Sequence, residues 1–194
     1  MASEPVNLEN SKYKSKIITI PNLLSFVRLC LIPLIVWLYT VERNYVWTGI
    51  VLILSFATDV IDGFIARTFN MQSDLGKILD PAADKLTQAT MLICLVLRFP
   101  LMLLPLCILL AKDIYMAISG ALVIQRTGEV MGADWHGKVA TGLLYAMMIL
   151  HVFWGELPKW LSVITISICA FMIAVSFFFY YKRNSMTLEE AEVE

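Results

Sequence analysis

The chain alternates between long apolar runs and short polar connections. Each of these runs is about long enough to cross a hydrocarbon layer of roughly 30 Å as a helix. The six runs lie near residues 22–40, 47–67, 78–98, 100–124, 138–155 and 158–181. Pro21, Pro100, Gly155 and Pro158 mark divisions between them, as helix-breaking residues do. The pattern predicts an all-α integral membrane protein with six transmembrane helices.

The polar ends of the chain divide it into three predicted parts. Residues 1–21 are expected to form a cytoplasmic N-terminal arm, residues 22–182 the six-helix domain, and residues 183–194 an acidic cytoplasmic tail. The arm suits either a short amphipathic segment on the membrane surface or a disordered basic lead-in. Because it is polar and the following apolar run is about a full span long, no cleavable signal peptide is expected.

Composition supports the membrane class. Of the 194 residues, 59% are hydrophobic and 16% are charged, and the mean hydropathy is +0.73. Soluble domains are about half apolar and about a quarter charged, so a soluble globular domain is excluded. The net charge of −1 gives no general reason to expect a nucleic-acid partner. Membrane lipids are the expected surroundings.

Basic residues beside the spans predict the orientation. With six spans both termini share one side, and that side carries Lys12, Lys14, Lys16, Arg67, Lys77, Arg126, Lys138, Lys182 and Arg183. The opposite loops carry only Arg43, Arg98 and Lys159. Because lysine and arginine concentrate in cytoplasmic loops, we expect a multi-pass protein of the cell membrane with both termini in the cytoplasm.

Four aspartates interrupt the second and third spans, where charge is costly and calls for a reason. Asp59 and Asp62 are three residues apart, and Asp80 and Asp84 are four apart. Both spacings place a pair on one face of a helix. A short loop joins the two spans, so they should pack antiparallel and bring the carboxylates together near the cytoplasmic surface.

Carboxylates gathered in this way favour a hard divalent cation, because they repel each other unless cations neutralise them. Oxygen ligands without cysteine or histidine indicate Mg²⁺ or Mn²⁺. Two such ions suit a diphosphate, whose leaving group they assist. A cation transporter is the alternative, but it predicts carboxylates spread along the membrane depth of several helices, whereas these lie at one end of two.

The aspartates belong to a longer pattern of eight fixed residues. It runs Asp59-x2-Asp62-Gly63-x2-Ala66-Arg67-x8-Gly76-x3-Asp80-x3-Asp84. This pattern resembles the signature of the CDP-alcohol phosphotransferase family. The resemblance implies a six-helix bundle with a cytoplasm-facing active-site cavity, open between the second and third spans. Family members commonly form homodimers, and the sequence shows nothing for or against one.

The resemblance also implies a role for each matched residue. Asp59, Asp62, Asp80 and Asp84 would bind two metal ions. The nucleotide would be bound by Asp59, Asp62, Gly63, Ala66, Arg67 and Gly76. Asp84 would also be the general base for an alcohol that attacks the phosphorus of CDP-diacylglycerol and displaces CMP. An alcohol is a weak nucleophile at neutral pH, so a positioned base and metals suit this chemistry.

The acceptor alcohol is less defined. Residues 20–28 and 76–85 resemble both bacterial phosphatidylglycerophosphate synthases and the related cardiolipin synthases. Glycerol 3-phosphate, the leading acceptor, requires fixed positive charge for its phosphate. The candidates for that charge are Arg28, Lys112, Arg126, His136 and Lys138. Phosphatidylglycerol, the acceptor in cardiolipin synthesis, is the alternative, followed by another alcohol such as serine or a polyol phosphate.

Two departures from the phosphatidylglycerophosphate synthases weaken the assignment of glycerol 3-phosphate and suit phosphatidylglycerol at least as well. The fourth span has Lys112-Asp113-Ile114 where the synthases usually have Arg-Glu-Ile, and residues 137–141 have one lysine fewer. Plainer interpretations also stay open: Lys112 and Asp113 as a neutralising pair, Arg28 reaching to the membrane interface, Lys138 and Arg126 following the charge bias of cytoplasmic loops, and His136 as an interfacial anchor.

Overall fold

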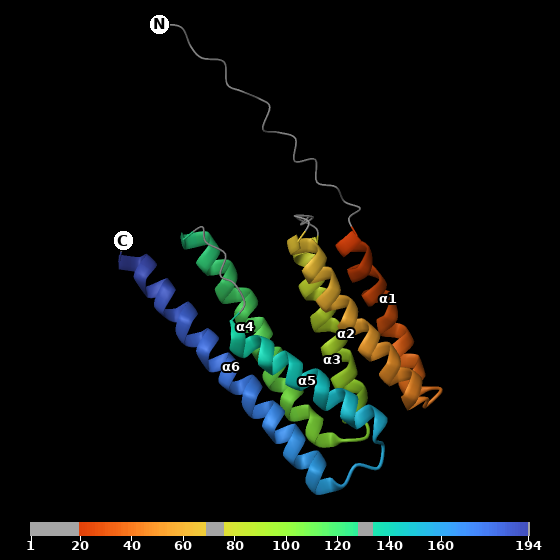
Figure 1. The fold of residues 1–194 in the computed structure, drawn as a ribbon. Coiled ribbons are helices and arrows are strands. Elements are labelled where there is room, and N and C mark those ends of the chain that lie inside the picture. Colours follow the sequence, from red (N-terminus) through yellow and green to blue (C-terminus); the bar gives the residue numbers. More distant parts are fainter. Residues whose placement is uncertain (1–19, 69–75, 128–133, 194) are drawn as a thin grey trace, which may run out of the picture.

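The structure is a computed structural model and describes residues 20–68, 76–127 and 134–193. Side chains of residues 20–21, 60, 62–68, 76–78 and 191–193 are outside this description. The described residues form α1 (Ile20–Thr40), α2 (Tyr45–Thr68), α3 (Gly76–Val96), the 3₁₀ turn η2 (Pro100–Met102), α4 (Leu103–Thr127), α5 (Trp135–Phe153) and α6 (Lys159–Val193) (Figure 1). The predicted all-α fold is therefore confirmed.

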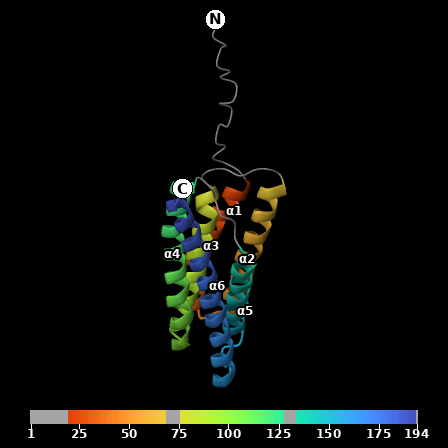
Figure 2. The same cartoon turned by 90° about the vertical axis from the view of Figure 1, so that its left-hand side faces the viewer.

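The helices run roughly along one axis in two groups (Figures 1 and 2). Helix α1 packs against α2 and α3, while α6 packs against α4 and α5. Contacts between α2 and α5 and between α3 and α4 join the two groups. The start of α1, the end of α2, the start of α3 and the ends of α4 and α6 share one end of the bundle (Figure 1). We call this the carboxylate end, since α2 and α3 carry the predicted aspartates there.

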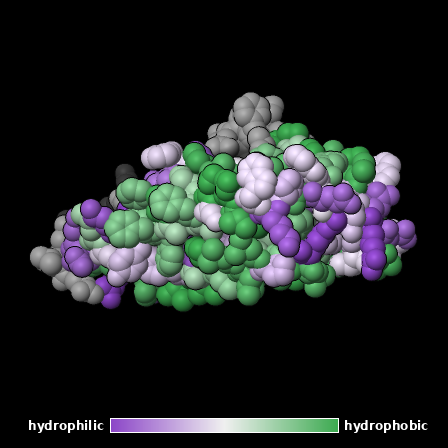
Figure 3. All heavy atoms as spheres, turned by 90° about the horizontal axis from the view of Figure 1, so that it is seen from below, coloured by the Kyte–Doolittle hydropathy of each residue, from purple (hydrophilic) through white to green (hydrophobic). Residues whose placement is uncertain are grey.

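Apolar side chains fill the interior and also cover the outside. Leu52, Leu92, Met148 and Ile166 are fully buried in one core that spans α2, α3, α5 and α6. By contrast, Phe171 on α6 is 70% exposed, and hydrophobic residues cover much of the face shown in Figure 3. An apolar outer surface of this extent suits contact with lipid rather than water.

Three stretches of the described residues are long and apolar enough to cross a membrane: Asn22–Thr40, Pro100–Thr127 and Lys159–Glu190. Helix α2 has a shorter apolar stretch, Tyr45–Asp59. The polar C-terminal part of α2 lowers the mean hydropathy of that helix, and the polar start of α3 does the same for α3. The membrane class is thus supported, and the six-span layout stays a prediction.

The largest boundary difference is at the C-terminus. Helix α6 continues to Val193, whereas the apolar run predicts an end near residue 181. The predicted acidic tail is therefore helical as far as the structure describes it. Hydropathy marks the apolar part of a helix only, and the residues that follow include good helix formers such as Leu188, Glu189 and Glu190.

Candidate active site

Helices α2 and α3 place three of the predicted ligands at the carboxylate end. Asp59, Asp80 and Asp84 are half-buried, and Asp59 lies near enough to the other two for their charges to interact. Asp62 follows one turn later on α2, but its side chain is outside the described part. The same holds for Gly63, Ala66, Arg67 and Gly76. The nucleotide-binding set therefore stays a prediction.

The donor chemistry of these aspartates suits Mg²⁺ or Mn²⁺, since carboxylate oxygens are the ligands such ions prefer. Among the described residues, no three histidine, cysteine or acidic side chains form a group that could hold an ion. That set lacks Asp62, the fourth predicted ligand. The two helices thus carry suitable ligands at the same end of the bundle, while the metal centre itself stays a prediction.

Asp84, the predicted base, is held by two side chains that the sequence did not reveal. Tyr145 on α5 donates its hydroxyl to Asp84 Oδ1 at 2.9 Å, and Gln88 Nε2, one turn along α3, donates to Oδ2 at 2.7 Å. Both donors are buried. The Tyr145 ring also packs on Phe56, with centroids 4.5 Å apart. Both carboxylate oxygens are therefore oriented by residues with little freedom to move.

Helix α1 contacts the other two aspartates. Arg28 is fully buried, and its Nη1 donates to Asp59 Oδ1 at 2.6 Å. One turn earlier, the buried Ser25 hydroxyl donates to Asp80 Oδ1. Arg28 was predicted to bind the acceptor or to reach the interface. Because it is fully buried against a carboxylate, it does not reach the interface. It is not among the residues that line the cavity described next, and its role in binding the acceptor stays a prediction.

A cavity of about 720 Å³ opens beside the aspartates. Asp59 and Phe56 of α2 line one part of it, and the predicted acceptor residues Lys112 and Lys138 line another. The complete lining is Phe56, Asp59, Pro81, Ala82, Lys85, Lys112, Asp113, Met116, Ala117, Gly137, Lys138, Thr141, Gly142 and Tyr180. Arg126 is exposed in the last turn of α4 and is not part of this lining.

The lysines of the cavity differ in their ion pairs. Asp113 Oδ1 lies 3.2 Å from Lys85 Nζ and 3.8 Å from the buried Lys112 Nζ. The predicted pair between Lys112 and its neighbour is therefore present, but Lys85, which the sequence did not single out, is the nearer partner. Among described residues no ion pair is found for Lys138, which is exposed. Positive charge exceeds negative charge on this side of the cavity.

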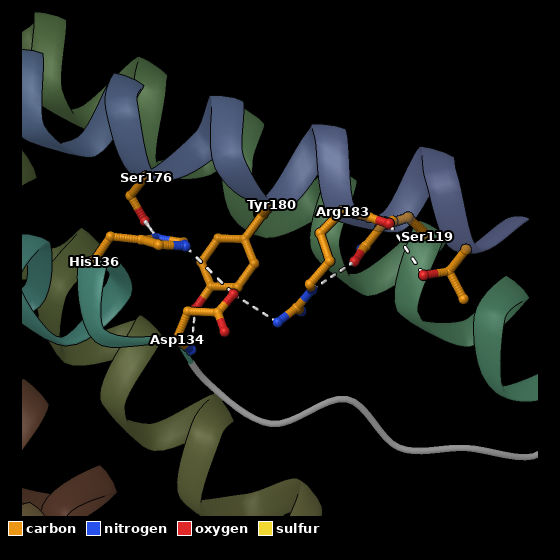
Figure 4. A network of polar contacts seen from close by, with 8 residues as sticks. Ser119, Asp134, His136, Ser176, Tyr180 and Arg183 are labelled. Atoms are coloured by element: carbon orange, nitrogen blue, oxygen red, sulfur yellow. Dashed lines mark hydrogen bonds and ion pairs between the residues drawn. The ribbon is translucent and has the colours of Figure 1, made fainter.

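A polar network joins the start of α5 to α6 (Figure 4), and its member Tyr180 also lines the cavity. Arg183 Nη1 donates to Asp134 Oδ2 at 2.6 Å, and the Asp134 N–H donates to Tyr180 Oη at 3.1 Å. His136 lies 3.3 Å from Asp134 and 3.2 Å from Ser176 Oγ. His136 is buried, so its interpretation as an interfacial anchor is wrong. Its neighbour Trp135 is the exposed residue.

A family model and several relatives match this chain. Residues 18–179 match the model of the CDP-alcohol phosphatidyltransferase family. A cardiolipin synthase (CMP-forming) of Streptomyces coelicolor is 35% identical over 141 residues, 70% of this chain and 66% of its own length. The CDP-diacylglycerol--glycerol-3-phosphate 3-phosphatidyltransferase of Aquifex aeolicus is 42% identical over 110 residues, 55% of this chain and 61% of that protein.

A further relative covers more of both chains. The Bacillus subtilis protein of the same name is 29% identical over 183 residues, 85% of this chain and 94% of its own. The chain thus spans less than two thirds of the length of the Streptomyces and Aquifex relatives.

Fold and site together define a helical bundle with an apolar outer surface and, at one end, a carboxylate site beside a cavity lined by three lysines, Lys85, Lys112 and Lys138. The chain belongs to the CDP-alcohol phosphatidyltransferase family.

Proposed function

We propose that this protein transfers the phosphatidyl group of CDP-diacylglycerol to glycerol 3-phosphate and releases CMP. The observation that carries this proposal is the shared cavity, which has Asp59 on one side and Lys85, Lys112 and Lys138 on another. The acceptor phosphate is a dianion, and lysines are suited to bind it as point charges. Lys85 and Lys112 both lie within ion-pair distance of Asp113, whereas no ion pair is found for Lys138 among the described residues. Lys138 is therefore the lysine whose charge is least neutralised by a carboxylate.

The metal centre is part of the same proposal. Asp59, Asp62, Asp80 and Asp84 would hold two Mg²⁺ or Mn²⁺ ions, which offset charge on a diphosphate and ease departure of the leaving group. Gly63, Ala66 and Gly76 would leave room for the cytidine nucleotide, and Arg67 would pair with its phosphate or with an acidic neighbour.

In the proposed reaction Asp84 takes the proton of the acceptor hydroxyl. The acceptor oxygen then forms a bond to the phosphorus that carries diacylglycerol, and the bond from that phosphorus to the CMP oxygen breaks. Tyr145 and Gln88 support this role, because their hydrogen bonds hold the Asp84 carboxylate in one orientation. A general base must first lie within hydrogen-bonding reach of the proton that it takes, and only then does its pKa affect the rate.

Phosphatidylglycerol is the second candidate acceptor. It is favoured by relatives named cardiolipin synthase at 34–35% identity and by the Lys112-Asp113 departure noted above. It also carries a phosphate and a free hydroxyl, so the same lysines and the same base would serve. For both candidates, the proposed reaction lies at the cytoplasmic face of the cell membrane, within a domain spanning residues 22–182. Whether the protein forms a homodimer, as family members commonly do, stays open.

The test is CMP release from labelled CDP-diacylglycerol in Mg²⁺, with glycerol 3-phosphate or phosphatidylglycerol offered separately. Release that requires glycerol 3-phosphate and is lost in Asp84→Asn supports the proposal. Glu156→Gln, on the exposed turn at the other end of the bundle, is the matched control and should remain active. Release only with phosphatidylglycerol identifies a cardiolipin synthase. Metal flux into proteoliposomes without CMP release would favour a transporter instead.

A further inference from the structure

Two buried polar residues on α1 lie outside the eight-residue pattern yet contact its aspartates. Ser25 and Arg28 are both fully buried and lie three positions apart, so they share one face of the helix. That helix packs against both α2 and α3. Burying a guanidinium is costly unless it is paired. The ion pair with Asp59 therefore accounts for the buried position of Arg28.

The described contacts include one to each of the two aspartate-bearing helices. Arg28 bonds Asp59 of α2, and Ser25 bonds Asp80 of α3. In each case the bonded atom is Oδ1. A carboxylate that accepts a hydrogen bond at one oxygen is restrained in orientation and keeps its second oxygen for another partner. Helix α1 thus constrains one carboxylate on each side of the site.

We propose that Ser25 and Arg28 are positioning residues for the cation centre: they hold Asp59 and Asp80 through one oxygen each and leave the other oxygen for the divalent ion. This inference rests on the proposed function, because it assumes that the aspartates bind a metal. Residues that orient metal ligands typically affect affinity about 10- to 100-fold when they are changed.

Charge alone predicts the opposite result for Arg28. A guanidinium beside the site repels a divalent cation, so removing its charge would tighten binding if repulsion were its main effect. Arg28→Lys keeps the charge but loses the planar fork, whereas Arg28→Gln loses the charge. Positioning predicts weaker binding in both variants. A purely electrostatic role predicts wild-type affinity in the lysine variant and tighter binding in the glutamine variant.

The experiment measures Mn²⁺ affinity of the full chain in phosphatidylcholine nanodiscs, from the electron paramagnetic resonance signal of free Mn²⁺. We expect Ser25→Ala, Arg28→Lys and Arg28→Gln to bind Mn²⁺ about 10- to 100-fold more weakly. Ser162→Ala and Arg98→Lys are matched controls. Ser162 is a buried serine bonded to His151 at 3.0 Å, and Arg98 stacks on Tyr45; neither contacts the aspartates, so both should match wild type.

Ser25→Ala provides the decisive arm, because it removes only a hydroxyl and disturbs folding least. Its CMP release should recover at high Mn²⁺ with an unchanged KM for the acceptor. Wild-type Mn²⁺ affinity in folded Ser25→Ala and Arg28→Lys would overturn the inference, as would a raised acceptor KM with unchanged Mn²⁺ affinity. Failure of the wild type to bind Mn²⁺ and to release CMP would instead overturn the proposed function, and this inference with it.

Discussion

Tyr145→Phe isolates one hydrogen bond of the proposed base. The substitution removes the hydroxyl that donates to Asp84 at 2.9 Å and keeps the ring that packs on Phe56. A hydrogen bond to a charged group is worth about 1.5–3 kcal/mol, and about 1.4 kcal/mol corresponds to a tenfold change in rate. Because Gln88 still holds the other oxygen, we expect kcat to fall about 10- to 100-fold.

The assay is steady-state CMP release, which separates kcat from the KM of each substrate. The KM values should change little, since Tyr145 is buried and not part of the cavity lining. Stability should change by no more than about 1 kcal/mol, because water can reach the half-buried Asp84 and replace the lost donor.

Tyr39→Phe is the matched control for this prediction. Tyr39 is also buried, but its hydroxyl has no hydrogen-bond partner among the described residues. Its loss should leave activity unchanged and stability equal or higher. If Tyr145→Phe kept the wild-type kcat, or lost no more activity than the control, Asp84 would not depend on this orientation and the role given to Tyr145 would be wrong.

Two further predictions concern the cavity wall. Lys138→Gln should raise the KM for glycerol 3-phosphate about tenfold, because a lost contact to the acceptor phosphate worth about 1.4 kcal/mol has that effect. Lys159→Gln, at the other end of the bundle, is the control and should leave this KM unchanged. Equal KM values for the two variants would contradict the acceptor role of Lys138. Gly137→Ala should destabilise the fold by about 1–2 kcal/mol, because its Cβ would lie 2.5 Å from Tyr180 Oη. Gly142→Ala should stabilise the fold by about 0.5–1 kcal/mol, because a Cβ added there has no atom within 4 Å. Thermal unfolding measures both changes, and a Gly137→Ala variant more stable than Gly142→Ala would contradict the packing described.

The helices and the pairing of α2 with α3 could be predicted because they depend on local properties. Apolar runs set the helices, breakers set the divisions, and a short loop makes neighbours antiparallel. Asp59, Asp80 and Asp84 come together for the same reason. Gln88 was also within reach of sequence reasoning, since it lies four residues after Asp84 on one helix face.

The partners on other helices could not be predicted in this way. Tyr145 is 61 positions from Asp84, and nothing in its apolar segment says which face of α5 turns toward α3. Ser25 and Arg28 left a weak signal, two polar residues three apart in an apolar run, but their targets depend on how α1 is rotated against its neighbours. Lys85 meets Asp113 for the same non-local reason.

The length of α6 has a consequence for where the substrates meet. At 1.5 Å per residue, its 35 residues span about 52 Å, against about 30 Å for the hydrocarbon layer. If the apolar part of α6, up to about residue 181, occupies the hydrocarbon layer as the sequence predicts, the C-terminal turns of α6 extend beyond the acyl chains. Asn184 in these turns donates to Ser119 Oγ of α4 at 2.8 Å, which keeps the two helices joined. Under the proposed function, a water-soluble acceptor would approach along these C-terminal turns of α6. The fatty-acid tails of CDP-diacylglycerol would stay beside the apolar surfaces of the helices, within the hydrocarbon layer.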